Sequence, residues 1–127
     1  EYASAGRATR VETRAVILAA GGFESGALEL DSYGVVRDTV CALPVMGPTG
    51  QLLHADFWGD EQPLFLAGLA VDDSMRVVDE NGKAVYTNLF AAGGNLAGAT
   101  RWREKSGEGI ALASALAAVD AIVEELK

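Results

Sequence analysis

The sequence predicts an α/β fold in which a mixed sheet carries a β-hairpin and one long C-terminal helix. Short continuous apolar runs are typical of strands buried on both faces, whereas alanine has the highest helix propensity. Two such runs each end in a glycine pair, and an alanine-rich segment without proline closes the chain: residues 15–20, 88–92 and 106–126.

The segments between the two apolar runs predict short elements. Residues 7–12 alternate weakly in polarity and predict an edge strand, whereas residues 24–31 predict one or two turns of helix. Proline and glycine interrupt regular structure, so the later segments are less uniform. Residues 34–41 predict a strand and residues 44–50 a loop. Residues 51–60 are either helical or irregular, and residues 64–71 predict a strand broken by Gly68.

The C-terminal half carries the clearest local signals. Asn81 and Gly82 separate two extended runs, and this dipeptide is typical of a hairpin turn. Ser106 is a favourable N-cap residue, and Glu108 in the first turn suits the helix dipole. Small side chains recur every three or four residues and predict the face that packs on a neighbour: Ile110, Ala113, Ala117 and Ala121.

Composition excludes several classes of function. The 127 residues carry 18 acidic and 10 basic side chains, a net charge of −8, which disfavours binding to nucleic acid. One cysteine, Cys41, and one histidine, His54, cannot form an internal disulfide or a zinc site, so no metal is expected. Cys41 is expected to be buried and inert. No apolar run reaches the roughly 20 residues of a membrane span, so a cytoplasmic protein is expected.

The second glycine pair and the helix after it predict a ligand site. A strand that ends in glycines, followed by a glycine-rich helix N-terminus, presents free N–H groups to an anion or polar ligand. The alternative is an ordinary strand–loop–helix connection whose glycines serve packing, and spacing alone leaves both interpretations open.

Residues 89–118 resemble the C-terminal signature of two-dinucleotide-fold flavoproteins of the fumarate reductase and succinate dehydrogenase type. Residues 16–23 are similar to the strand that returns to the nucleotide-binding sheet in that family. The resemblance implies returning nucleotide-domain strands in residues 1–23, part of a substrate or cap region in 24–70 and a flavin-facing part in 71–127. It also implies the cofactor-binding residues: Gly21, Gly22, Gly93, Gly94, Asn95, Ser106, Gly107, Glu108, Gly109 and Ile110.

A narrower resemblance, carried by residues 68–76, 87–91 and 107–109, is to the family of B-type subunits of anaerobic glycerol-3-phosphate dehydrogenase. It implies FAD or FMN as cofactor and oxidation of glycerol 3-phosphate to dihydroxyacetone phosphate. It further implies catalytic and membrane-anchoring partner subunits and a peripheral position on the inner face of the membrane. Gly94 stands where most relatives have an acid, so its side chain cannot hold the flavin, and Asn95 is the candidate replacement.

The glycine loop G-x-G-x-x-G that cradles a dinucleotide pyrophosphate does not occur in this sequence. The chain opens on Glu1 without a start signal and is interpreted as a fragment that binds no cofactor alone and is inactive. A homodimer would cover its exposed apolar surface. The alternative is a non-catalytic interaction module that keeps the flavoprotein fold. Catalytic residues stay unassigned, with Arg101 a candidate for binding an anion and His54 for moving a proton.

Overall fold

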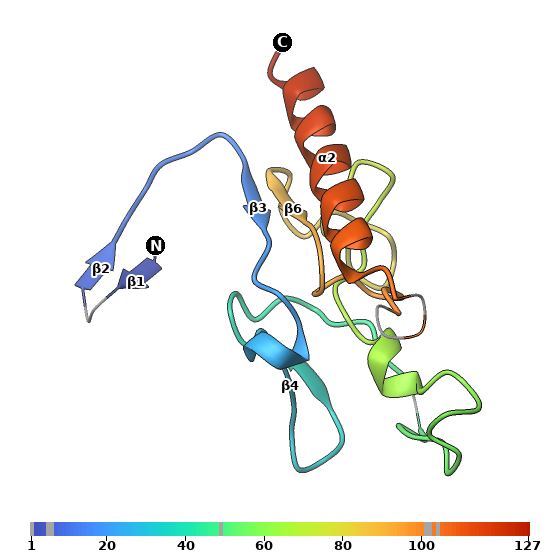
Figure 1. Cartoon of the computed structure of the whole chain (residues 1–127). Coiled ribbons are helices and arrows are strands. Elements are labelled where there is room, and N and C mark those ends of the chain that lie inside the picture. The colour runs from blue at the N-terminus through green and yellow to red at the C-terminus, as the bar shows by residue number, and fades with distance from the viewer. Residues whose placement is uncertain (1, 5–6, 49, 101–102, 104) are drawn as a thin grey trace.

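The computed structural model describes residues 2–4, 7–48, 50–100, 103 and 105–127, in which small sheets precede a long C-terminal helix (Figure 1). Each sheet contains two strands. The pairs are antiparallel β1 (Tyr2–Ser4) with β2 (Arg7–Thr9), parallel β3 (Val16–Leu18) with β6 (Leu89–Ala91), and antiparallel β4 (Leu28–Leu30) with β5 (Val36–Asp38).

The parallel pair of β3 and β6 forms the centre of the fold. Both predicted strands are confirmed, with Ile17 opposite Phe90 and Leu18 opposite Ala91. Strand β6 is buried throughout. The prediction that β3 is buried on both faces was wrong, because Val16 is 41% exposed and, among the described strands, β3 pairs only with β6.

Strand β6 has a parallel neighbour on one edge and an antiparallel neighbour on the other, so the strand arrangement is mixed. Arg76 forms an antiparallel bridge with Phe90, so β6 lies between a parallel strand and an antiparallel segment. The predicted hairpin is confirmed by the bridge between Val78 and Ala84. Gly82 has a φ of +75° at the turn, a backbone conformation that glycine adopts without steric cost.

The prediction of helix for residues 24–31 was wrong beyond a single turn. A 3₁₀ turn, η1 (Phe23–Ser25), stops at Gly26, which adopts the left-handed conformation, and β4 follows. The Oδ1 of Asp31 accepts hydrogen bonds from the N–H groups of Tyr33 and Val35 and closes the β4–β5 turn. The Val35 hydrogen bond is the main cause that lowers the pKa of the Asp31 carboxyl.

Two further strand predictions were too long. Residues 34–41 contain only β5, because the Asp38 carboxylate accepts hydrogen bonds from the N–H groups of Cys41 and Leu43 and folds the chain into a turn. Residues 64–71 begin as a 3₁₀ helix, η2 (Pro63–Leu66), followed by isolated bridges rather than a strand. Proline at the start of η2 already has the φ of a helical turn.

Cys41 is exposed, contrary to the prediction that it is buried. The turn held by Asp38 carries it outward from the end of β5. Partial burial and then the nearby Asp38 carboxylate raise the pKa of the Cys41 thiol. A thiol with a raised pKa stays protonated at neutral pH, which disfavours a nucleophilic role.

Helix α2 (Gly107–Glu125) confirms the predicted C-terminal helix. Ser106 occupies the N-cap position, but its side chain makes no capping hydrogen bond. The predicted packing face was wrong by one residue, because Ser114 and Ala118 are buried whereas Ala113 and Ala117 are exposed.

Helix α2 and the residue after it carry an apolar stripe that the described residues leave partly exposed. Its members follow spacings of three and four residues and therefore share one helix face. They are Leu112, Leu116, Val119, Val123 and Leu126.

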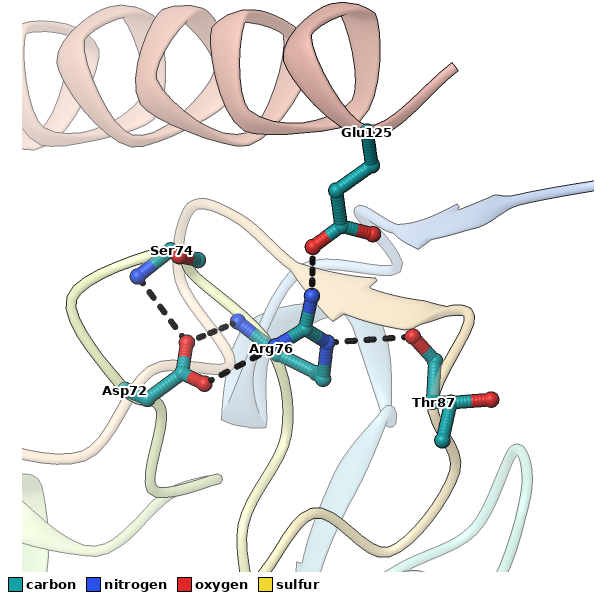
Figure 2. Close-up of polar contacts among 5 residues, drawn as sticks. All are labelled: Asp72, Ser74, Arg76, Thr87 and Glu125. Carbon is teal, nitrogen blue, oxygen red and sulfur yellow. Dashed lines mark hydrogen bonds and ion pairs between the residues drawn. The ribbon is translucent and has the colours of Figure 1, made fainter.

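Arg76 ties the C-terminal end of α2 to the sheet (Figure 2). Its guanidinium pairs with Glu125 of α2 and with Asp72, and its Nε donates to the Thr87 carbonyl at 3.0 Å. It also lies 5.3 Å from the centre of the Phe90 ring, within the range of a cation–π contact. One side chain thus joins the hairpin, β6 and α2.

At Gly68 the backbone lies very close to the backbone of residues 95–97. Its N–H and carbonyl both pair with Met46 at 2.8 Å. A Cβ built at Gly68 would lie 2.5 Å from the Ala97 nitrogen and 2.6 Å from the Asn95 carbonyl oxygen. Only glycine therefore lets this segment lie against residues 95–97.

We predict that Gly68→Ala lowers the free energy of unfolding by about 1–3 kcal/mol, because backbone atoms must move to admit the methyl group. The matched control is Gly47→Ala, whose Cβ would meet only the Ala67 methyl at 3.5 Å. That variant is expected to change stability by less than about 0.5 kcal/mol. Urea unfolding of both variants gives the comparison, and equal effects would contradict the close approach at Gly68.

Candidate functional site

The candidate site lies where β3 and β6 end. Because the strands are parallel, their carboxyl ends meet at one edge, which is where ligands bind in open α/β sheets. Gly21 and Gly93 follow the two strands with φ of +87° and +82°. A Cβ at Gly21 would lie 2.4 Å from the Ser25 hydroxyl, so this edge is closely packed as well as free of side chains.

Asn95 joins three segments at this edge. Its Nδ2 donates to the Leu18 carbonyl of β3 at 3.0 Å, and its own carbonyl accepts from the Leu69 N–H at 2.7 Å. The residue is 2% exposed. Its Oδ1 is buried without a hydrogen-bond partner among the residues that the structure describes. An unsatisfied buried acceptor costs about 1–3 kcal/mol, which a bound donor would recover.

Ser114 fixes α2 against the end of β6. Its hydroxyl accepts a hydrogen bond from the Gly93 N–H at 2.9 Å and donates to the Ile110 carbonyl at 2.6 Å. Gly93 therefore contributes no N–H group to a ligand. The sequence signal that we missed is a serine that shares a helix face with Ile110 and Ala118.

The start of α2 lies beside the same edge. A Cβ at Gly93 would be 3.8 Å from the Ala111 methyl. The first hydrogen bond within the helix runs from the Ile110 N–H to the Ser106 carbonyl at 2.8 Å, so the preceding N–H groups have no acceptor within the helix. The structure thus places Gly93 against Ala111 and Ser114 of α2, next to the predicted helix residues 106–110.

A pocket of about 300 Å³ opens next to Gly94 and was not predicted from the sequence. Aromatic side chains from three segments form much of its wall: Phe23, Phe57, Trp58 and Phe65. Glu24, Ala67, Gly94 and Ala99 complete the lining. The aromatic residues at 57, 58 and 65 were the available signal, but their approach to Phe23 depends on tertiary structure.

Of the two candidate catalytic residues, the structure places one. His54 is half-buried and does not line this pocket, and its backbone N–H donates to the Gln62 Oε1 at 2.6 Å. Arg101 lies outside the described residues. Within the described ranges, no three side chains of the types that ligate metals are clustered, and no helix combines the length and apolar character needed to cross a membrane.

Two proteins from two strains of Halobacterium salinarum resemble the chain over most of its length. Each is named as a probable B-type subunit of anaerobic glycerol-3-phosphate dehydrogenase and is 30% identical over 111 residues. The aligned region is 87% of this chain but 26% of each relative, so the chain spans about a quarter of their length. No solved structure matches the chain significantly.

A family model described as FAD binding domain matches residues 35–110. This region is more than half of the 127 residues and includes β6, Asn95 and the first residues of α2. It begins after β3, so the first glycine pair lies outside the match. The resemblance to flavoproteins of the fumarate reductase and succinate dehydrogenase type is confirmed. The chain belongs to the FAD binding domain family.

Proposed function

We propose that the chain is the C-terminal, flavin-facing part of the B-type subunit of an anaerobic, quinone-linked glycerol-3-phosphate dehydrogenase. In the full complex this enzyme would oxidise glycerol 3-phosphate to dihydroxyacetone phosphate. The observation that carries the proposal is the buried Oδ1 of Asn95, which is unpaired among the described residues and lies at the glycine-lined edge of a parallel strand pair. The named relatives share most of this chain, which supports the choice of dehydrogenase.

The division of the chain supports the same proposal. We assign residues 1–23 to the returning strands of the nucleotide-binding domain, 24–70 to part of the substrate or cap region, and 71–127 to the flavin-facing part. The parallel pairing of β3 with β6 supports placing the first and last parts in one sheet. The β4–β5 hairpin and three of the four aromatic residues of the pocket wall, Phe57, Trp58 and Phe65, lie in the intervening region.

The residues at the edge fit a flavin, FAD or FMN, which supplies two-electron chemistry when bound. Asn95 would accept a hydrogen bond from a hydroxyl of the flavin side chain through its Oδ1. The N–H groups of Gly107, Glu108 and Gly109 precede the first hydrogen bond of α2 and would face the electronegative end of the ring. Gly21 and Gly22 would let the cofactor pass close to the backbone.

Three departures from an ordinary flavin site favour a second candidate, a non-catalytic module that keeps the fold without the cofactor. Gly94 has no side chain that could hold the flavin, and the Gly93 N–H is already bonded to Ser114. The sequence also lacks the pyrophosphate-binding glycine loop. The chain would therefore be a half-site that needs another segment or another polypeptide to bind its cofactor.

The apolar stripe of α2 supports the need for a covering surface. Leu112, Leu116 and Val123 are among its exposed apolar residues, and water contact at such a stripe is unfavourable. We propose that partner subunits of the complex, catalytic and membrane-anchoring, hold the protein at the inner face of the membrane. In the isolated chain, a homodimer would cover the stripe.

We predict that the purified chain binds FAD only substoichiometrically, because its sequence does not contain the G-x-G-x-x-G loop that cradles the pyrophosphate. Co-expression with the part of a Halobacterium relative that precedes the matched region is expected to give a complex that retains FAD through gel filtration. Visible flavin absorbance per protein provides the measurement. A stoichiometrically yellow isolated chain would contradict the half-site, and a colourless complex would favour the non-catalytic module.

Asn95→Leu is expected to weaken FAD binding by that complex about tenfold, the loss of roughly one hydrogen bond. The matched control is Ser114→Ala, which also removes a buried hydrogen bond at this edge but leaves the Asn95 Oδ1 in place. Both variants should lose stability, whereas only Asn95→Leu should lose affinity in a titration with FAD. Equal affinities would remove Asn95 from the cofactor site.

A further inference from the structure

The apolar stripe of α2 has the spacing of a seam between two helices. Its members alternate steps of four and three residues: Leu112, Leu116, Val119, Val123 and Leu126. This is the a and d pattern of a heptad repeat, in which each apolar position faces a second helix. Leu112 is 73% exposed and Leu116 is 58% exposed, so the described residues do not fill this role. The pattern therefore indicates a helix as the element that covers the stripe.

A basic residue borders one flank of the stripe. A groove of about 330 Å³ lies between residues 13–17 and the C-terminal half of α2, and Ile122 and Arg14 belong to its lining. Among the described residues that line this groove, Arg14 alone is charged. Arg14 is exposed and forms no ion pair with another described residue.

The opposite flank is acidic. A helix turns about 100° per residue, so Asp120 and Ile122 lie on opposite sides of the stripe and Asp120 points away from the groove. Asp120 is exposed and also lacks an ion-pair partner among the described residues. The nearby Glu124 is neutralised by Lys127, with which it pairs. The flank therefore presents the unpaired carboxylate of Asp120.

Two further carboxylates of α2 do not change this assignment. Glu125 is paired with Arg76 on the side that faces the hairpin. Glu108 lies on the groove flank but at the opposite end of the helix from Arg14, where a parallel partner helix would present the neutral Ala113. The charges that remain are one basic and one acidic flank near the C-terminal half of the stripe.

These flanks make the stripe complementary to itself in one orientation. In a parallel pair with twofold symmetry, each helix sets one flank against the other flank of its partner, so Arg14 lies on the side of the partner's Asp120. In an antiparallel pair the helices would meet at Val119, the middle of the stripe, and like flanks would face each other. Two Asp120 carboxylates would then approach, and like charges at an interface are unfavourable.

We propose that two copies of this chain dimerise through the stripe with their α2 helices parallel and with Arg14 of each copy beside Asp120 of the other. This inference deepens the homodimer in the proposed function and needs no flavin. The stripe covers about two heptads, fewer than a stable coiled coil has, so the dissociation constant is expected on the order of 10–100 µM. Both glycine edges would lie at the same end of the dimer, because Gly93 is bonded to the N-terminal half of α2.

Sedimentation equilibrium of the 127-residue chain, measured without flavin up to millimolar concentration, tests the proposal. Leu116→Gln is expected to weaken dimerisation at least tenfold. The matched control is Leu53→Gln, at a leucine that is 48% exposed and outside the stripe, which leaves the dissociation constant unchanged. Arg14→Glu and Asp120→Arg are each expected to weaken the dimer severalfold, whereas the double variant regains affinity. Circular dichroism checks that every variant is folded.

Disulfide trapping tests the orientation. Cys41→Ser first removes the exposed native thiol. In that background, oxidation by copper phenanthroline is expected to join Leu112→Cys chains to each other, because a parallel seam places identical positions together. An antiparallel seam would instead place residue 112 beside residue 126 of the partner. A mixture of Leu112→Cys and Leu126→Cys chains would then give mainly the mixed disulfide.

Four results would overturn the proposal. They are a chain that stays monomeric at millimolar concentration, a dimer that Leu116→Gln leaves intact, mixed disulfides as the main product, and loss of the homodimer on co-expression with the part of a Halobacterium relative that precedes the matched region. The last result would assign the stripe to that part. Because none of these measurements uses flavin, the retention of FAD by the co-expressed complex remains a separate test of the proposed function.

Discussion

The side chain and backbone of Asn95 hold together the segments on which the candidate site depends. The Leu18 carbonyl at the end of β3 accepts from both the Ala92 N–H and the Asn95 amide, while the Asn95 carbonyl accepts from Leu69. These bonds connect three stretches of chain far apart in sequence. They form only because Gly68 admits residues 95–97 at a separation that a side chain would prevent. Glycine therefore explains both features of this edge: it removes the side chain, and it thereby lets the backbone segments pack closely.

The elements that the sequence predicted correctly are those with strong local signals. Helix α2 follows from alanine content and the absence of proline, and the hairpin turn follows from the conformational freedom of Gly82. The errors at residues 24–31 and 64–71 arose where hydrogen bonds or a single proline outweighed apolar patterning. Cys41 is exposed for the same kind of reason, since Asp38 turns the chain after β5.

The glycine edge of the site was predictable, whereas its surroundings were not. Glycines next to an apolar run indicate a backbone-lined edge whatever the rest of the chain does. Asn95 stays a candidate ligand residue implied by the family resemblance. Ser114 and the aromatic pocket depend on how distant segments meet. Phe23 and Phe65 are separated by more than forty residues, yet their rings pack edge to face. No local pattern encodes such a contact.

The Asn95 Oδ1 and the apolar stripe of α2 are both groups whose exposure or lack of a partner destabilises the isolated chain. A buried acceptor without a donor and an apolar face without cover each raise the free energy of the isolated chain, by a lost hydrogen bond in one case and by hydration in the other. Both costs fall when another group binds at the right place. The Gly93–Ser114 bond, by contrast, is already satisfied and keeps α2 against β6 without any ligand. The chain thus positions the helix by itself, whereas the Asn95 Oδ1 has no donor among the residues that the structure describes.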